Sequence, residues 1–348
     1  MKSERRGRAS AKKPLAGNVA VVAGATRGVG RGIALMLGEA GATVYCTGRS
    51  VRGKLASGKQ RPETINETAA LVTAQGGRGI AVRVDHTVAP QVARLFARVR
   101  REHGRLDVLV NDVWGGDALM EWGVPFWKLD MKKGQTMLER AIWAHVLTSR
   151  YGVPLMVERN AGLVVEVTDG DFLGWRGNLF YDLTKAGAIR LAYSMAADLR
   201  DTGVTAVAVT PGFLRSEAML DAFGVTEDNW REQVKKDRHF AESETPWYVG
   251  RAVAALAADP NVRAKSGRVF ASWTLAREYG FKDRDGRQPD WGRYMDGVVG
   301  DLLARGGPKE PDERFLLLVR YFWGHTEPAM HDEARRIADL LDIRFLRP

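Results

Sequence analysis

The residues with the clearest chemical potential form a pair in the segment YDLTK, where Tyr181 precedes Lys185 by four positions. Residues four apart in a helix lie on one face, so the phenol and the ammonium would be neighbours. A phenol can give or take a proton, and a nearby cation stabilises its phenolate form. The same spacing is also typical of a solvated helix surface, so this pair alone does not establish a site.

A second candidate is a glycine-rich turn between an apolar run and a helical pattern. Gly24, Gly28 and Gly30 have the spacing G-x-x-x-G-x-G. Glycines at such a turn let the chain bend tightly, let backbone N–H groups approach a pyrophosphate, and let the helix pack closely on the strand. We therefore expect a nucleotide site at this turn.

Two cations near the turn bear on the choice of nucleotide. The second apolar run ends in CTGRS. At this point NAD sites usually have an acidic residue whose carboxylate hydrogen-bonds to the ribose 2′-hydroxyl. This chain has Arg49 there and Arg27 in the glycine turn, and two cations with no carboxylate suit a 2′-phosphate. The pattern therefore predicts NADP(H), the alternative being that Arg49 is merely solvated. Asp85, at the end of the third run, is placed to accept a hydrogen bond from the adenine amino group.

The elements that would position these groups alternate between short apolar, β-branched runs and helical patterns, which is typical of a parallel sheet covered on both faces. Two regions depart from this rhythm: an aromatic-rich loop over 113–133, and a charged extension after about residue 290 that ends in a helical pattern. We predict strands over 18–23, 42–47, 79–84, 106–110, 162–167, 204–209 and 267–271, and helices over 88–102, 134–157, 180–201 and 246–258.

The bulk composition limits the class of protein. The 348 residues are 45% hydrophobic and 27% charged, as in ordinary globular proteins with a substantial core. No apolar run approaches the roughly 18–20 residues that span a bilayer, and the N-terminus lacks the apolar stretch of a secretory signal, so we expect a cytoplasmic protein. Cys46 is the only cysteine, which excludes an intramolecular disulfide and a cysteine-cluster metal site.

The net charge of +10 is concentrated near the N-terminus, where residues 1–14 carry half of the excess. We expect residues 1–15 to form a disordered basic tail. Such a tail can bind nucleic acid non-specifically, but a solubilising role is the favoured interpretation, and no specific nucleic-acid partner is predicted.

Four motifs, in this order, resemble the short-chain dehydrogenase/reductase superfamily: the glycine turn at 24–30, VND at 110–112, Tyr181-x-x-x-Lys185, and the PG of TPGFLRS at 210–216. A narrower likeness, strongest over 266–287, is to the subgroup that contains mammalian dehydrogenase/reductase SDR family member 1. The resemblance implies an α/β Rossmann fold with a doubly wound, seven-stranded parallel sheet in the order 3-2-1-4-5-6-7. It implies an NADP-binding catalytic domain over 16–290, with substrate loops near 113–133 and 213–245, and a C-terminal helical extension over 291–348.

The resemblance also implies roles for individual side chains. Tyr181 would be the general acid or base, and Lys185 would stabilise its phenolate and hold the nicotinamide ribose. Thr168, thirteen residues before Tyr181, stands where the family has a serine that orients the substrate oxygen. The implied cofactor contacts are Gly24, Thr26, Arg27, Gly28, Val29, Gly30, Arg49, Asp85, Asn111, Tyr181, Lys185, Pro211, Gly212, Phe213 and Ser216.

Two positions depart from the family pattern. The family has an asparagine in the long helix after the fourth strand, where it anchors a water near the lysine, and this chain has Ala141 there. His145, one turn along, either replaces that asparagine or, as the favoured interpretation, is a packed or surface histidine. Asn111 is expected to tie strands together, and Trp114 to form a wall of the active site.

Aromatic residues near the expected mouth of the site indicate a bulky, apolar carbonyl or alcohol substrate, although about half of them would serve as ordinary core or contact residues. We expect substrate contacts from Trp114, Trp175 and Phe213, and Asp169 and Asp171 could contact polar or cationic groups. The predicted function is an NADP-dependent carbonyl reductase or alcohol dehydrogenase without a metal. The alternative is a catalytically attenuated NADP(H) sensor or scaffold of the same fold. The family likeness implies a homodimer or homotetramer built on helices 134–157 and 180–201.

Overall fold

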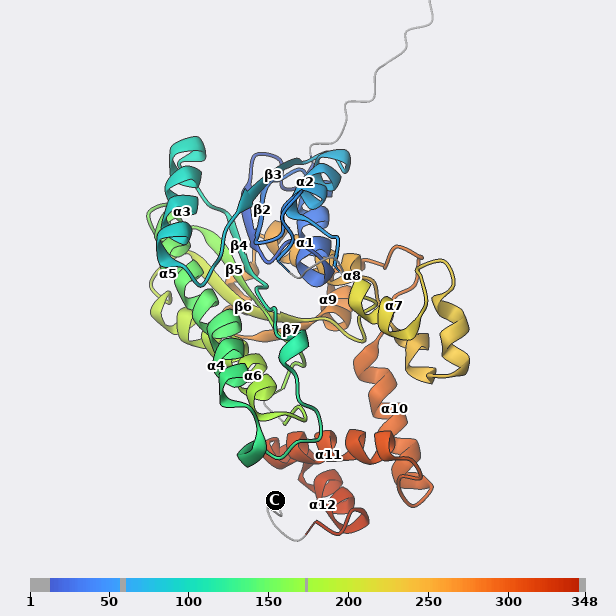
Figure 1. Ribbon diagram of the computed structural model, residues 1–348. Coiled ribbons are helices and arrows are strands. Elements are labelled where there is room, and N and C mark those ends of the chain that lie inside the picture. Colours follow the sequence, from blue (N-terminus) through green and yellow to red (C-terminus); the bar gives the residue numbers. More distant parts are fainter. Residues whose placement is uncertain (1–12, 57–60, 173–174, 344–348) are drawn as a thin grey trace, which may run out of the picture.

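A seven-stranded parallel sheet forms the centre of the computed structural model, which describes residues 13–56, 61–172 and 175–343 (Figure 1). The strand order is β3-β2-β1-β4-β5-β6-β7, so the predicted doubly wound topology is confirmed. Most of the predicted basic tail, residues 1–12, lies outside the described residues. The strands are β1 Val19–Ala23, β2 Thr43–Gly48, β3 Arg78–Arg83, β4 Val108–Asn111, β5 Gly162–Val167, β6 Val204–Thr210 and β7 Val269–Ala271.

The point at which the strand order reverses lies between β1 and β4. β1 pairs in parallel with β2 on one side and with β4 on the other, so the connections leaving β1 and β4 turn to opposite sides. In open parallel sheets this reversal leaves a crevice at the carboxyl ends of the strands, where nucleotides bind. The glycine-rich turn directly follows β1 and therefore lies at this crevice.

Helices cover both faces of the sheet because successive strand residues are apolar on both sides. In β1, Val22 packs into the core on one face and Val21 into the core on the other. The first face is covered by α1 Gly28–Glu39, α2 Ile65–Ala74 and α8 Pro246–Ala258, and the second by α3 Ala89–His103, α5 Ala144–Val157 and α6 Leu179–Asp198.

The helix expected over 134–157 begins earlier and is interrupted. It consists of α4 Met131–Leu138, a π-helical turn η3 Glu139–Trp143, and α5. The aromatic-rich loop before it contains two short 3₁₀ turns, η1 Asp117–Leu119 and η2 Phe126–Lys128. π-helical turns occur most often at functional sites. Ala141, which stands at the family's asparagine position, lies within this turn.

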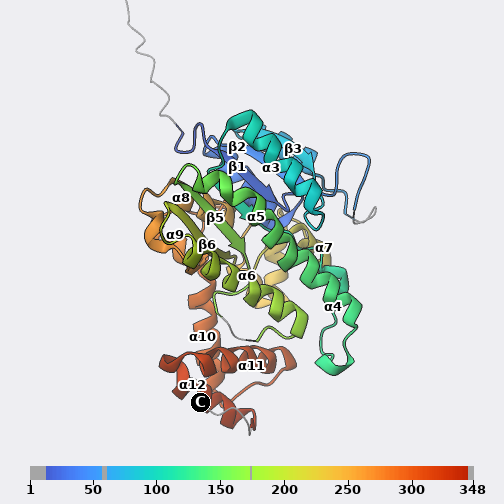
Figure 2. The ribbon, with the colours of Figure 1, turned by 90° about the vertical axis from the view of Figure 1, so that its left-hand side faces the viewer.

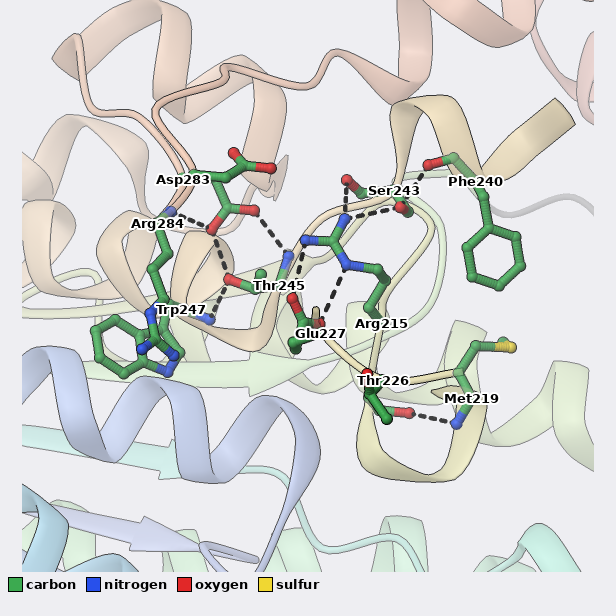
Figure 3. A network of polar contacts seen from close by, with 12 residues as sticks. Arg215, Met219, Thr226, Glu227, Phe240, Ser243, Thr245, Trp247, Asp283 and Arg284 are labelled. Atoms are coloured by element: carbon green, nitrogen blue, oxygen red, sulfur yellow. Dashed lines mark hydrogen bonds and ion pairs between the residues drawn. The ribbon is translucent and has the colours of Figure 1, made fainter. Parts of the chain in front are cut away.

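In the segment 213–245, which was expected to contact the substrate, the buried side chain of Arg215 connects distant residues of the segment (Figure 3). Its guanidinium donates to the Ser243 carbonyl at 2.8 Å and pairs with Glu227 at 3.1 Å. Thr245 donates from its backbone amide to Asp283 at 2.8 Å, which ties the end of the segment to the chain after β7. The segment contains α7 Glu217–Phe223 and the 3₁₀ turns η4 Trp230–Lys235 and η5 Arg238–Glu242.

The C-terminal helices have a small core of their own, formed around Leu302, Leu317, Tyr321 and Ile337. Figures 1 and 2 show α10 leading away from the sheet to a layer formed by α11 and α12. In the described part of the chain, no helix is both long enough and apolar enough to cross a membrane. The remaining elements are η6 Val262–Lys265, α9 Ser272–Tyr279, α10 Trp291–Ala304, α11 Pro311–Thr326, η7 Pro328–Met330 and α12 His331–Leu340.

Candidate active site

A cavity of about 830 Å³ opens at the carboxyl ends of the strands and joins the glycine-rich turn to the Tyr181–Lys185 pair. Most residues predicted for the cofactor and for catalysis therefore share one cavity. The predicted residues that line it are Gly24, Thr26, Arg27, Gly28, Val29, Arg49, Asp85, Trp114, Thr168, Tyr181, Lys185, Pro211, Gly212, Phe213 and Ser216.

The glycine-rich turn presents a backbone amide to an anion. Gly28 opens α1, and its N–H donates to a carboxylate oxygen of Glu217 at 2.8 Å. Helix N-termini bind anions through such amides, and here the anion bound by the Gly28 amide is a carboxylate of the same chain. Gly24 must be glycine, because a Cβ there would lie 2.3 Å from the Asp112 carbonyl oxygen and its φ is +95°. Gly30 does not line the cavity and instead packs behind the turn, against Gly24.

The two arginines expected at the ribose have acidic neighbours. Arg27 lies 3.4 Å from Glu63, and Arg49 lies 4.0 Å from Asp85. The segment that directly follows β2 carries no carboxylate, but the fold brings Glu63 and Asp85 to the two arginines. Glu63 precedes α2, and the fold carries it back over the glycine-rich turn. Both cations still line the cavity, where a 2′-phosphate would have to compete with these carboxylates.

Tyr181 is fixed in the first turn of α6 by the cap of that helix. The Asn178 side chain accepts hydrogen bonds from the amides of Phe180 and Tyr181, which starts the helix at Leu179. The Tyr181 ring makes edge contacts with Trp114 and Trp122, at centroid distances of 5.6 and 5.5 Å. Tyr181 and both tryptophans line the main cavity.

The Tyr181 hydroxyl donates to Asp169 at 2.6 Å. Burial and the negative charge of Asp169 hold the pKa of the phenol well above its ordinary range. The Lys185 ammonium lies one turn along, 4.7 Å from the centroid of the Trp114 ring, and burial lowers its pKa. Burial and Asp169 thus favour the neutral phenol, whereas the family resemblance implies that Lys185 favours phenolate.

Thr168 lies in the cavity wall, as expected of a residue in the serine position, but its hydroxyl is already engaged. It donates to the backbone carbonyl of Lys185 at 2.7 Å. A hydroxyl has one proton to donate, so Thr168 would have to rotate to donate to a substrate oxygen. This contact joins the end of β5 to α6 beside the Tyr181–Lys185 pair.

Behind Lys185 lies a second cavity of about 10 Å³, bordered by Asp112, Ala141 and His145. This volume is about that of one water molecule, and the polar lining suits one. Burial raises the pKa of Asp112 to about 7, although the charges of Lys185 and His145 favour its carboxylate form. A titratable acid therefore stands near the lysine, in the region where the family has an asparagine.

His145 itself is a packed residue, as the favoured interpretation held. Its Nδ1 lies 2.7 Å from the buried carboxylate of Glu166, and its Nε2 lies 3.0 Å from the Val113 carbonyl oxygen. Glu166 also accepts from Asn111 at 2.6 Å, and Asn111 donates further to Ser149 at 2.9 Å. Asn111 therefore links strands and helix, as expected, and it is not among the residues that line the cavity.

Some of the aromatic residues that were expected to contact the substrate line the cavity, and others pack against the C-terminal extension. Trp114, Trp122 and Phe213 line the cavity, and Phe213 stacks on Trp291 of α10 at 5.5 Å. Trp175 does not line it, because its ring packs against Phe315 and Phe322 of α11. The C-terminal extension thus contacts both the loop after β5 and the loop after β6.

Sequence reasoning missed four acidic residues of this region: Glu63, Asp112, Glu166 and Glu217. Glu166 had a readable signal, since it is the one charged residue in the apolar run GLVVEV. Asp112 belongs to the VND motif at 110–112, of which only Asn111 was given a role. In the described residues, no group of three or more His, Cys, Asp or Glu side chains is arranged to hold a metal ion.

The comparisons with known proteins agree with this geometry. The family model for short chain dehydrogenase matches residues 18–223. The chain is 39% identical over 279 residues to dehydrogenase/reductase SDR family member 1 of Mus musculus, covering 79% of this chain and 85% of that protein. It is 37% identical to the Homo sapiens protein of the same name, with the same coverage. A solved short chain dehydrogenase from Mycobacterium thermoresistibile has a TM-score of 0.65 at 20% identity, covering 80% of this chain and 92% of that one, which supports the fold. The chain therefore belongs to the short-chain dehydrogenase/reductase family of oxidoreductases.

Proposed function

We propose that the chain is an NADP(H)-dependent oxidoreductase that acts on the carbonyl or secondary alcohol group of a bulky, apolar substrate. The observation that carries this proposal is that an anion-binding glycine turn and the Tyr181–Lys185 pair share one cavity of about 830 Å³. When bound, the cofactor would supply or accept the hydride.

The residues for holding the cofactor are distributed along the cavity. The amides of the glycine turn at 24–29 would bind the pyrophosphate, and Arg27 and Arg49 would bind the 2′-phosphate. At the nicotinamide end the chain bends at Pro211 and Gly212, and Ser216 adds a hydroxyl. The Ser216 oxygen accepts from the Met219 amide, so its proton is available to a carboxamide oxygen.

Proton transfer is assigned to Tyr181, which would donate to the carbonyl oxygen during reduction and accept from the alcohol during oxidation. Lys185 would hold the nicotinamide ribose and stabilise negative charge on the phenol oxygen. Thr168, once its hydroxyl has turned from the Lys185 carbonyl, would take the serine role and orient the substrate oxygen. Trp114, Trp122 and Phe213 give the cavity wall the apolar character that a bulky substrate needs.

A panel of aryl and alicyclic ketones with NADPH, and of the matching alcohols with NADP⁺, tests this function at the nicotinamide absorbance band. Tyr181→Phe should reduce turnover by about 100-fold or more while leaving the Kd for NADPH unchanged. Tyr193→Phe is the matched control, since Tyr193 lies exposed on the same helix. Unchanged turnover in Tyr181→Phe would exclude Tyr181 as the acid. NADPH binding without turnover would instead support the sensor or scaffold alternative.

A further inference from the structure

Asp169, the second residue after β5, makes a direct contact with the proposed acid. Tyr181 Oη donates to Asp169 Oδ2 at 2.6 Å, and both residues line the main cavity. Thr168, at the family's serine position, instead gives its proton to the Lys185 carbonyl. The side chain that meets the phenol proton in this chain is therefore a carboxylate, which can accept that proton as well as hydrogen-bond to it.

The position of Asp169 is fixed by its loop. The buried Arg176 donates from Nε to the Asp169 carbonyl oxygen at 2.5 Å, and from Nη1 to Asp182 of α6 at 3.2 Å. The Gly170 amide donates to Thr210 Oγ1 at 2.8 Å, which ties the same turn to the end of β6. Because the backbone is held on both sides, the carboxylate is presented to the phenol by the fold.

The surrounding charges favour a neutral phenol paired with this carboxylate. After burial, the charge of Asp169 is the main factor that keeps the pKa of Tyr181 above its ordinary range, Asp117 of η1 acts in the same direction, and Arg176 opposes it. Lys185 lies one turn along α6, where burial lowers its pKa against the attraction of Asp169, Asp112 and Asp117. The phenol therefore keeps its proton and donates it in a hydrogen bond to Asp169.

We propose that Asp169 is a catalytic residue that exchanges a proton with Tyr181 during turnover, an inference that rests on the proposed role of Tyr181. In alcohol oxidation the substrate hydroxyl proton passes to the Tyr181 oxygen while the Tyr181 proton passes to Asp169. When bound, the oxidised cofactor would accept the carbon-bound hydrogen as hydride, so the overall change would give a carbonyl compound, reduced cofactor and protonated Asp169. Reduction reverses each transfer. No free phenolate has to form in either direction.

The first test follows Tyr181 itself and needs no substrate. The chain has eight tyrosines, so ¹³Cζ-tyrosine NMR gives few signals, and Tyr181→Phe identifies the one from Tyr181. Asp169→Asn keeps the shape and removes the charge, and it should lower the pH at which Tyr181 ionises by about one unit or more. Asp171→Asn, the same change two residues away, should leave that pH close to the wild-type value. Coincident titrations of wild type and Asp169→Asn would overturn the proposal.

The second test follows oxidation of 1-phenylethanol and 1-indanol with NADP⁺ as a function of pH. Asp169→Asn should be slower than wild type by about tenfold or more near neutrality, and the two rates should converge at alkaline pH, where phenolate can accept the proton directly. Parallel pH profiles would overturn the catalytic role even if the NMR titration shifts. If the wild type binds NADPH but oxidises neither alcohol, the result counts against the proposed substrate class, and the NMR titration alone decides the Asp169–Tyr181 pair.

Discussion

The carboxylate of Glu217 accepts a hydrogen bond from the backbone amide of Gly28 at 2.8 Å, so the first residue of α7 lies on the first residue of α1. Its other oxygen lies 3.8 Å from Arg31. A phosphate bound at this helix N-terminus would need the same amide. The Glu217 carboxylate therefore occupies the amide that is proposed to bind the pyrophosphate, and cofactor binding would require Glu217 to move.

Glu217→Gln should strengthen NADPH binding by about threefold, because the variant removes a partly exposed negative charge that opposes the pyrophosphate. The Kd can be measured by titrating NADPH fluorescence. Glu67→Gln is the matched control, since Glu67 also pairs with Arg31, at 2.6 Å, whereas the partner of the Gly28 amide is Glu217. Weaker binding in Glu217→Gln, or an equal change in both variants, would contradict this account.

NADPH should bind more tightly than NADH, and Arg49→Ala should reduce the affinity for NADPH by about tenfold while changing that for NADH little. The physical reason is that the Arg49 guanidinium lies in the cavity wall, only loosely paired with Asp85 at 4.0 Å, and can turn to a 2′-phosphate. Arg52→Ala removes an exposed cation from the same loop and should leave both affinities unchanged. Equal affinities of the wild type for the two cofactors would refute the assignment.

The fold could be predicted because its signals are local. Each strand is a short run that is apolar on both sides, and every predicted strand overlaps an observed one, from Val19–Ala23 to Val269–Ala271. The glycine turn and the Tyr181–Lys185 spacing lie within single elements, so their placement follows once the sheet order is known. The helix predicted over 134–157 was less accurate, because a π-helical turn at Glu139–Trp143 interrupts it and leaves no clear periodic signal.

The electrostatic environment of the site could not be predicted, because it depends on contacts between distant elements. Glu63 reaches Arg27 across the glycine turn, and Glu217 reaches Gly28 from 189 positions away. The environment of Tyr181 also depends on the direction of one hydroxyl. The Thr168 hydroxyl donates to the Lys185 carbonyl, and the Tyr181 hydroxyl donates to Asp169. Such rotamer choices follow from packing and not from residue spacing.

The extension should stabilise the loop after β5 through its aromatic contacts. Trp175 packs on Phe322 of α11 at a centroid distance of 5.6 Å, so Phe322→Ala should increase deuterium uptake in the peptide that carries residues 169–172. The Kd for NADPH should not change. Leu318→Ala is the control, because Leu318 packs in the core of the extension itself. Equal uptake by the two variants would show that the aromatic contact does not order this loop.

Glu244 lies in a fully buried position and contacts Gly212, in the loop after β6, and Ser272 at the start of α9. One carboxyl oxygen accepts from the Gly212 amide at 2.9 Å and from Ser272 at 2.6 Å, while the other has no hydrogen-bond partner. Burial raises the pKa of this carboxyl from its ordinary value of 4.5 to about 8. The folded chain therefore holds a proton at neutral pH that the unfolded chain would release.

This proton makes the stability of the fold depend on pH. Between pH 4.5 and about 8 the folded state binds more protons than the unfolded state, so the contribution of Glu244 is fully present below that window and is lost as the pH rises through it. Glu244→Gln keeps a neutral side chain at every pH. The free energy of unfolding of the variant, relative to wild type, should rise across this window by a few kcal/mol (order of magnitude) and level off above it. Urea unfolding at a series of pH values measures this difference, with Glu232→Gln, an exposed change in the same segment, as the control. A constant difference across the window would show that Glu244 does not hold the proton.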